Sequence, residues 1–130
     1  MWLSSFSTGQ RHAMLGLAHN VIVSDGLLDP NEEGMLLELK QEMGLSEVEE
    51  LDYLELEGIQ DVFQDKRSRM VVVINLIKLS YVDGAFEIEE ECLLKEIARS
   101  FDISDNDFLL LDNWVRRLSA LEEEAQAFFN

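Results

Sequence analysis

The same short pattern of residues occurs twice in this chain, and it limits how the chain can fold. The two copies are 58 residues apart and share Asp25-Gly26 and Asp83-Gly84, then Glu32-Glu33 and Glu90-Glu91. Apolar residues follow each copy at helical spacing, at Met35, Leu36, Leu39 and Met43 and at Leu93, Leu94, Ile97 and Phe101. Because a single helix-turn-helix unit leaves one apolar face open, we expect the two units to pack together around an approximate two-fold axis. Such packing can bring the two Asp-Gly turns near one another.

Capping signals and apolar periodicity predict a compact all-α bundle of about seven helices. The expected helices cover 10–24, 30–44, two short stretches between 46 and 63, 69–82, 87–101, and 104 to nearly the C-terminus. Ser46 with Glu49 and Ser104 with Asp107 have the same capping-box pattern, so each pair is expected to start a helix. The β-branched run at 71–74 resembles a buried strand, but the apolar stretch around it is longer than ten residues and has no partner strand. We therefore expect a helix there too.

The size of the chain favours a single domain. Its 130 residues, of which 47% are hydrophobic, are enough for one core and too few for two. No Pro-rich or Gly/Ser-rich linker divides the sequence, which contains a single proline. We expect one helical domain over residues 1–130.

The charge is strongly negative and excludes two classes of partner. The chain has 27 acidic and 10 basic residues, a formal net charge of -17. Such a surface repels nucleic acid and anionic lipid, because both are bound mainly through clustered Lys and Arg. We expect no nucleic-acid partner. The one local basic cluster, Lys66, Arg67 and Arg69, could instead receive an acidic protein.

Cysteine usage and hydropathy favour a cytoplasmic protein. Cys92 is the only cysteine, so no disulfide can form within one chain, and we expect this residue to pack inside the protein. The longest apolar run, 70–82, is interrupted by polar residues and is too short to cross a bilayer. The N-terminal residues do not have the pattern of a signal peptide. We therefore expect no direct membrane insertion.

The duplicated turn resembles a known family. The second copy reads Tyr81-Val82-Asp83-Gly84-Ala85-Phe86-Glu87-Ile88-Glu89-Glu90, with helical apolar spacing after the last glutamate. This pattern, repeated in a helical chain, is similar to the TerB-like (tellurite-resistance) family, whose domain is also found ahead of J-domains in some membrane-anchored co-chaperones. The similarity runs from about Gln10 to Leu121, and Ser24 replaces the small or aromatic apolar residue often found before the first Asp.

The resemblance implies a compact helical bundle that acts in tellurite resistance and wider chemical-stress responses. It also implies that the protein works through metal binding and protein contacts, not through catalysis. The acidic positions of the family fall here on Asp25, Glu32, Asp83 and Glu90.

Two interpretations of these acidic residues stay open. Hard cations such as Ca²⁺ or Mg²⁺ prefer oxygen ligands, so converging turns could form a metal site. Its ligands would be Asp25, Glu32, Asp83 and Glu90, helped by Asp29 and Glu87. Alternatively, Asp29 and Glu87 cap helices, and Glu32 and Glu90 complete capping boxes. An EF-hand is excluded, because Pro30 and Ile88 stand where that loop needs glycine.

The remaining signals concern catalysis and partners. No Ser-His-Asp order, glycine-rich phosphate loop or HExxH sequence is present, so we expect neither an enzyme nor an organic cofactor. Phe128 and Phe129 follow the charge run at 122–124, and this tail is either a solvated, frayed end or a contact for a protein partner or a second copy. The function predicted is a metal-binding, partner-binding module, and the alternative is a purely structural interaction or oligomerisation domain.

Overall fold

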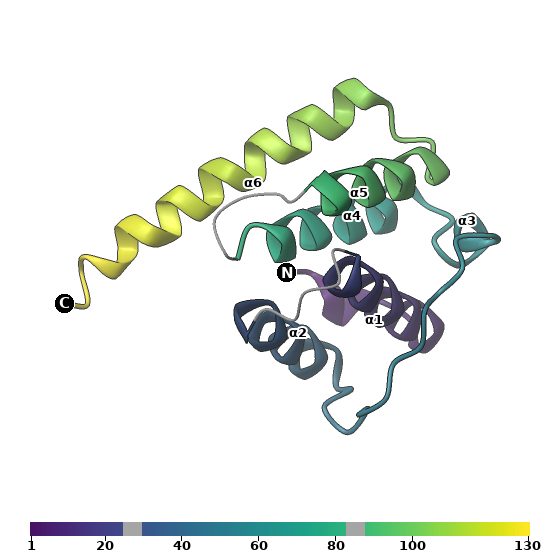
Figure 1. The fold of residues 1–130 in the computed structure, drawn as a ribbon, viewed down its shortest axis with the longest axis horizontal. Coiled ribbons are helices and arrows are strands. Elements are labelled where there is room, and N and C mark those ends of the chain that lie inside the picture. The colour runs from purple at the N-terminus through teal and green to yellow at the C-terminus, as the bar shows by residue number, and fades with distance from the viewer. Residues whose placement is uncertain (25–29, 83–87) are drawn as a thin grey trace.

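The computed structural model describes residues 1–24, 30–82 and 88–130, and all regular structure in these ranges is helical (Figure 1). The elements are the 3-10 helix η1 (Leu3–Ser5) and the α-helices α1 (Thr8–Val23), α2 (Pro30–Met43), α3 (Ile59–Val62), α4 (Lys66–Ser80), α5 (Ile88–Ser100) and α6 (Asp105–Gln126). The all-α prediction is confirmed. The described ranges contain six α-helices and not about seven, and the difference arises between residues 46 and 57.

Helices α1 and α4 lie at the centre of the bundle. α1 packs against α2, α3, α4 and α5, while α4 packs against α1, α2, α5 and α6. Their apolar side chains are fully buried where the two helices face each other and their neighbours, at Met14, Leu17, Val21, Val72, Leu76 and Leu79. α6 lies on the outside of α4 and α5, and its C-terminal half extends past the other helices (Figure 1). None of the helices in the described ranges combines the length and apolarity needed to cross a membrane.

The two helix pairs begin at matching positions in the sequence. α1 starts at Thr8 and α4 at Lys66, and α2 starts at Pro30 and α5 at Ile88, so each start is separated from its counterpart by 58 residues. The contacts match as well, since α1 packs on α5 and α4 packs on α2. These two pairs therefore face each other in a reciprocal arrangement.

The ends of α2 and α5 are also built alike. Gly44 and Asp102, again 58 residues apart, both have left-handed backbone conformations, with φ values of 71° and 59°. The amide of the following residue donates a hydrogen bond to the carbonyl oxygen of Lys40 at 2.8 Å in the first case and of Ala98 at 2.9 Å in the second. This is the usual way in which a helix end satisfies its last carbonyl groups.

Arg11 holds the end of α2 against the N-terminal segment. Its guanidinium donates hydrogen bonds from Nε to the carbonyl oxygen of Phe6 at 2.9 Å, from Nη1 to that of Met43 at 2.8 Å and from Nη2 to that of Ser4 at 2.7 Å. One side chain thus satisfies three carbonyl groups from two segments.

Arg69, the residue 58 positions further on, does the same for α5. It donates from Nε to the carbonyl oxygen of Phe63 at 2.6 Å, from Nη1 to that of Phe101 at 3.2 Å and from Nη2 to that of Gln60 at 3.2 Å. The sequence suggested that Arg69 forms part of a basic docking surface. In the structure its guanidinium, which is only partly buried, is bound to carbonyl oxygens of the same chain.

The segment 46–57 is not helical, which corrects the prediction of a helix starting at Ser46. The backbone N–H of Leu54 donates to Oδ1 of Asn20 at 3.0 Å, and Nδ2 of Asn20 donates to the carbonyl oxygen of Leu54 at 2.7 Å. The Leu54 side chain packs directly on Gly16, where an added Cβ would lie 3.0 Å from the leucine Cβ. Because Asn20 supplies both hydrogen bonds, an extended strap satisfies the backbone at this point without a helix.

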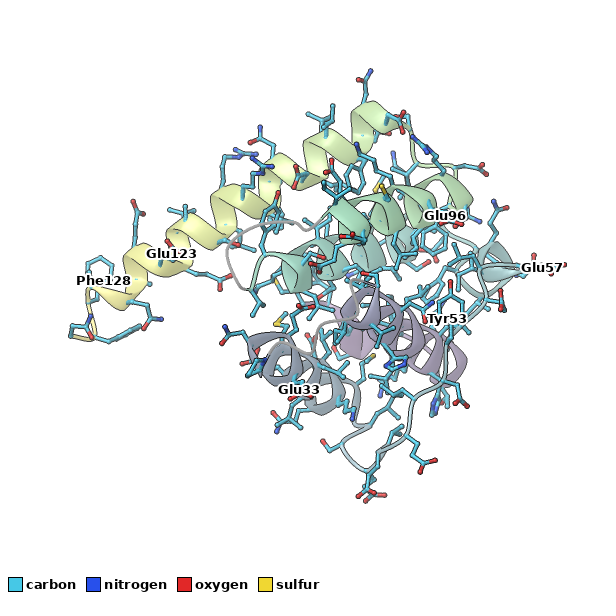
Figure 2. All side chains as sticks on the ribbon, in the orientation of Figure 1. Glu33, Tyr53, Glu57, Glu96, Glu123 and Phe128 are labelled. Atoms are coloured by element: carbon cyan, nitrogen blue, oxygen red, sulfur yellow. The ribbon has the colours of Figure 1, made fainter. Side chains whose placement is uncertain are left out.

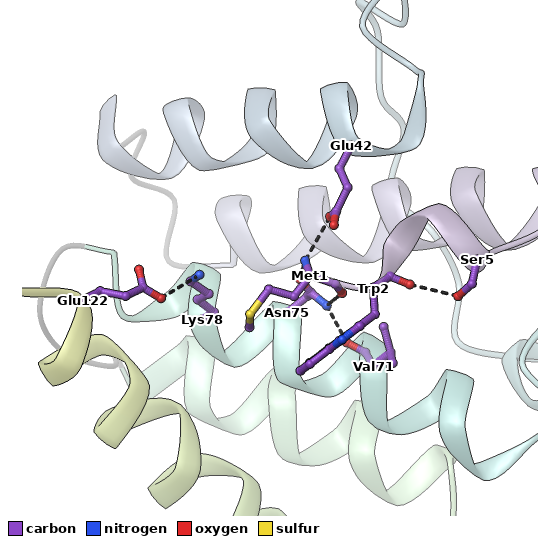
Figure 3. A network of polar contacts seen from close by, with 8 residues as sticks. All are labelled: Met1, Trp2, Ser5, Glu42, Val71, Asn75, Lys78 and Glu122. Atoms are coloured by element: carbon purple, nitrogen blue, oxygen red, sulfur yellow. Dashed lines mark hydrogen bonds and ion pairs between the residues drawn. The ribbon is translucent and has the colours of Figure 1, made fainter. Parts of the chain in front are cut away.

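The N-terminal residue joins α2 to α4 through a polar network (Figure 3). The ammonium group of Met1 donates to Oε2 of Glu42 at 2.9 Å and to Oδ1 of Asn75 at 2.8 Å. Nδ2 of Asn75 donates in turn to the carbonyl oxygens of Met1 at 2.9 Å and Val71 at 2.8 Å. The fully buried Asn75 is thereby satisfied inside an otherwise apolar helix.

Candidate functional site

The six predicted metal ligands divide between described and undescribed parts of the chain. Asp25, Asp29, Asp83 and Glu87 lie outside the described residues, and so do both Asp-Gly turns. Glu32 and Glu90 lie within them, each in the first turn of a helix. The convergence of the two turns, expected from the sequence, therefore concerns residues outside the described part.

Glu32 and Glu90 are buried, which is unusual for glutamate. Each is the third residue of its helix, α2 or α5, and their side chains are 2% and 1% exposed. The neighbouring Glu33 and Glu89 are exposed, so the burial belongs to this one helical position and not to the whole acidic turn. Glutamate is rarely fully buried unless its charge is compensated.

The physical chemistry of this position favours a negative charge. The N-terminus of a helix carries a partial positive charge and has N–H groups without intrahelical partners, and both stabilise a carboxylate there. The third helical position is also where a capping-box glutamate stands, although the residues that would be its capping partners, Asp29 and Glu87, are not described. Burial opposes the charged form of a carboxylate, because the charge leaves water.

A second polar cluster fixes the chain just before the second Asp-Gly turn. The Tyr81 hydroxyl donates to Oδ1 of Asp112 at 2.6 Å, and Nε of Arg116 donates to the Tyr81 oxygen at 2.7 Å. Burial, together with the hydrogen bond to Asp112, raises the pKa of Tyr81 from 10.0 to about 12. The cluster ties the end of α4 to α6.

The described residues alone do not form a complete metal site. Within them, no three side chains of His, Cys, Asp or Glu gather closely enough to hold an ion. Ca²⁺ takes six to eight oxygen ligands. The acidic residues that could complete a site at Glu32 or Glu90, namely Asp25, Asp29, Asp83 and Glu87, lie outside the described residues.

A surface groove of about 570 Å³ lies beside α2. α1, α2 and the strap line it with the side chains of Ile22, Val23, Leu36, Leu37 and Leu51 and with the charged or polar groups of His19, Glu33, Lys40 and Glu49. Leu37 is 50% exposed here, so apolar surface is open to solvent next to the helix that carries Glu32.

Sequence reasoning missed several residues of this region. Tyr81 belongs to the repeated motif, but no local signal indicates that its hydroxyl joins two helices. The 58-residue shift aligns Arg11 with Arg69, and this alignment is the sequence signal for their common role. Cys92 was expected to pack inside the protein and is exposed instead. Its side chain lies on the outer face of α5, two residues past the buried Glu90.

Searches of protein-family models, of curated proteins and of solved structures found no match to this chain.

Proposed function

We propose that this chain is a non-catalytic, TerB-like acidic helical module that binds a divalent cation, Ca²⁺ or Mg²⁺, next to Glu32 and Glu90. The observation that carries the proposal is the burial of these two glutamates at the same position of two helices. Each lies seven residues after the aspartate of an Asp-Gly pair, and a further acidic residue, Asp29 or Glu87, stands between them. A hard cation is the ligand that best compensates a group of carboxylates in such a place.

The matched architecture supports a pseudo-repeated pair of units of the TerB-like kind. Helix starts, left-handed helix ends and the two carbonyl-binding arginines all recur at a distance of 58 residues. Under the same shift Asp25 corresponds to Asp83 and Glu32 to Glu90, so one chain would offer two equivalent acidic sets. The role in tellurite or chemical stress, and the contact with a protein partner, follow from the family resemblance.

The alternative function is a structural interaction domain in which the carboxylates only stabilise helix ends. The favourable helix dipole and the capping-box position of both glutamates favour it. The two functions differ in one respect, because only the first makes the stability of the fold depend on a particular cation.

Thermal unfolding of chelator-treated protein distinguishes the two functions. We expect a saturable rise in melting temperature with Ca²⁺ or Mg²⁺ at constant ionic strength, since a ligand that binds only the folded state stabilises it by mass action. The double variant Glu32→Gln and Glu90→Gln, and separately Asp25→Asn and Asp83→Asn, should abolish that rise. Mn²⁺ and Zn²⁺ serve as comparison ions.

The matched control is Glu33→Gln with Glu89→Gln, which removes the same charge from two exposed neighbours. This variant should keep the full cation response. An equal response of all variants to every ion would show only screening of the net charge and would favour the structural alternative. Titration calorimetry on the unmodified protein gives a second readout if the buried variants do not fold.

A further inference from the structure

The helix α6 carries an apolar stripe that continues after the helix has left the body of the protein. Val115 is its last buried residue, and the ion pair between Lys78 on α4 and Glu122, at 3.0 Å, lies close to the point where the two helices part (Figure 3). On this part of α6, Leu121, the residue just before Glu122, is 61% exposed, and Phe128 near the C-terminal end is 85% exposed. Figure 2 shows Phe128 at the far end of α6, away from the other helices.

The spacing of this stripe is that of a coiled coil. Its residues alternate in steps of three and four: Leu111, Trp114, Leu118, Leu121, Ala125 and Phe128. Apolar residues at such a 3.5-residue period form a straight seam for a second helix. Past Gln126, backbone hydrogen bonds from the amides of residues 127–129 to carbonyls three residues earlier continue the helical path, so Phe128 stays on the seam.

One side of the seam is already occupied by the body of the same chain. Val115 and Glu122 flank it there, the first buried in the core and the second paired with Lys78. The other side carries Arg117 and Glu124, which are both exposed and lie seven residues apart. A partner helix can therefore make flanking ion pairs only on the side of Arg117 and Glu124.

The charges of Arg117 and Glu124 on one copy of α6 are complementary to those on a second copy when the two helices are antiparallel. When two copies of α6 lie antiparallel, the flanking positions of this side face each other, so Arg117 of each copy lies opposite Glu124 of the other. In the same register Leu118 lies opposite Leu121. Phe128 then lies opposite Leu111 of the other copy.

We propose that two copies of the chain form an antiparallel dimer along α6, in which residues 117–129 of each copy lie against residues 110–122 of the other. The contact covers Leu121 and Phe128 and is flanked by two symmetric pairs of Arg117 with Glu124. The partner of the module in this proposal is a second copy of the chain. The contact uses a surface separate from Glu32 and Glu90, so the proposal does not depend on whether a cation binds there.

Sedimentation equilibrium over a wide range of protein concentration tests the proposal at physiological ionic strength, where charges beyond roughly 8 Å are largely screened. We expect a monomer–dimer equilibrium for the unmodified chain and its loss in Leu121→Glu. The matched control is Leu109→Glu on another face of the same helix, where the leucine is 58% exposed, and this variant should dimerise normally. A monomer up to millimolar concentration, or equal effects of both substitutions, would overturn the proposal.

The orientation has its own test. Arg117→Glu should abolish the dimer, and adding Glu124→Arg to the same chain should restore it, because the swap rebuilds both pairs. In a Cys92→Ser background, mixing Arg117→Cys with Glu124→Cys and a short bismaleimide should give mainly the mixed cross-link. Predominant Arg117→Cys homodimers would rule out the antiparallel arrangement. Leu121→Glu should leave any cation response unchanged, which separates this test from that of the metal site.

Discussion

Arg11 and Arg69 show how single side chains can complete the ends of helices in this protein. Each guanidinium donates to three carbonyl oxygens. One of them lies at the C-terminal end of α2 or α5, and the other two lie in the segment that precedes α1 or α4. Five N–H donors in a rigid fork make arginine suited to such a position, whereas the single ammonium of lysine could not span the same three acceptors. The helix ends α2 and α5 thus depend on residues that precede them in the sequence by about thirty positions.

At the residue scale, Tyr81 gives a prediction about alkaline pH. Its pKa is raised from 10.0 to about 12, so the folded protein keeps the phenol proton where the unfolded chain loses it. The resulting stabilisation is complete below pH 10 and is lost as the pH rises towards 12. In urea unfolding, we expect the stability difference between the unmodified chain and Tyr81→Phe to shrink over this range. A difference that stays constant with pH would contradict the role of the phenol proton.

The sequence predicts those residues whose role depends only on neighbours within a few positions of the chain. The helical positions of Glu32 and Glu90 follow from the repeat and the capping pattern, because both signals lie within a few residues. Their burial could not be predicted, since it depends on packing between helices far apart in the sequence. The same holds for Tyr81, whose partner Asp112 is 31 residues away.

At the element scale, two similar capping patterns in the sequence lead to different structures. Ser104 caps α6 by accepting a hydrogen bond from the backbone N–H of Asp107 at 3.1 Å, as the sequence predicts. Ser46 has an equivalent pattern with Glu49, but the chain continues as an extended strap. The difference lies in α1, because Asn20 binds the backbone of Leu54, and no local signal reports this distant competition.

The left-handed residues at the ends of α2 and α5 predict opposite changes in stability for two substitutions. Asp102 adopts a left-handed conformation that costs an L-residue about 1 kcal/mol and that glycine adopts freely. Asp102→Gly should therefore raise the free energy of unfolding by up to about 1 kcal/mol, and Gly44→Ala should lower it by a similar amount. Urea unfolding of both variants measures this. Destabilisation by Asp102→Gly would mean that the aspartate side chain contributes more than its backbone costs.

At the scale of the whole molecule, the 58-residue shift predicts two similar helix pairs. In the structure α1 packs against α2, and α4 packs against α5. The shift did not place η1, α3 or α6 relative to the pairs, since these have no counterpart of the same length. Nor could it show which glutamates face the interior, which decides where a cation would sit.

The central position of α1 and α4 predicts the pattern of amide hydrogen exchange. Both helices contact four other elements, so their amides should exchange most slowly, through opening of the whole fold. The outer half of α6 should exchange fast in dilute Leu121→Glu and slowly in concentrated unmodified protein. Fast exchange in the middle of α4 would show that the two helix pairs open separately. Slow exchange of residues 117–126 in the variant would mean that α6 is protected within one chain.

The strap at 46–57 has a consequence for how this chain could be divided. It is the part of the covalent link between the two helix pairs that contains no helix, and Glu49 and Glu50 within it are exposed. A cut at these residues would leave the Leu54 contact with Asn20 in place, along with the whole interface between α1 and α4. The two fragments would then be separate chains with complementary apolar faces. The fold is thus suited to fragment complementation, with each half acting as the template on which the other refolds.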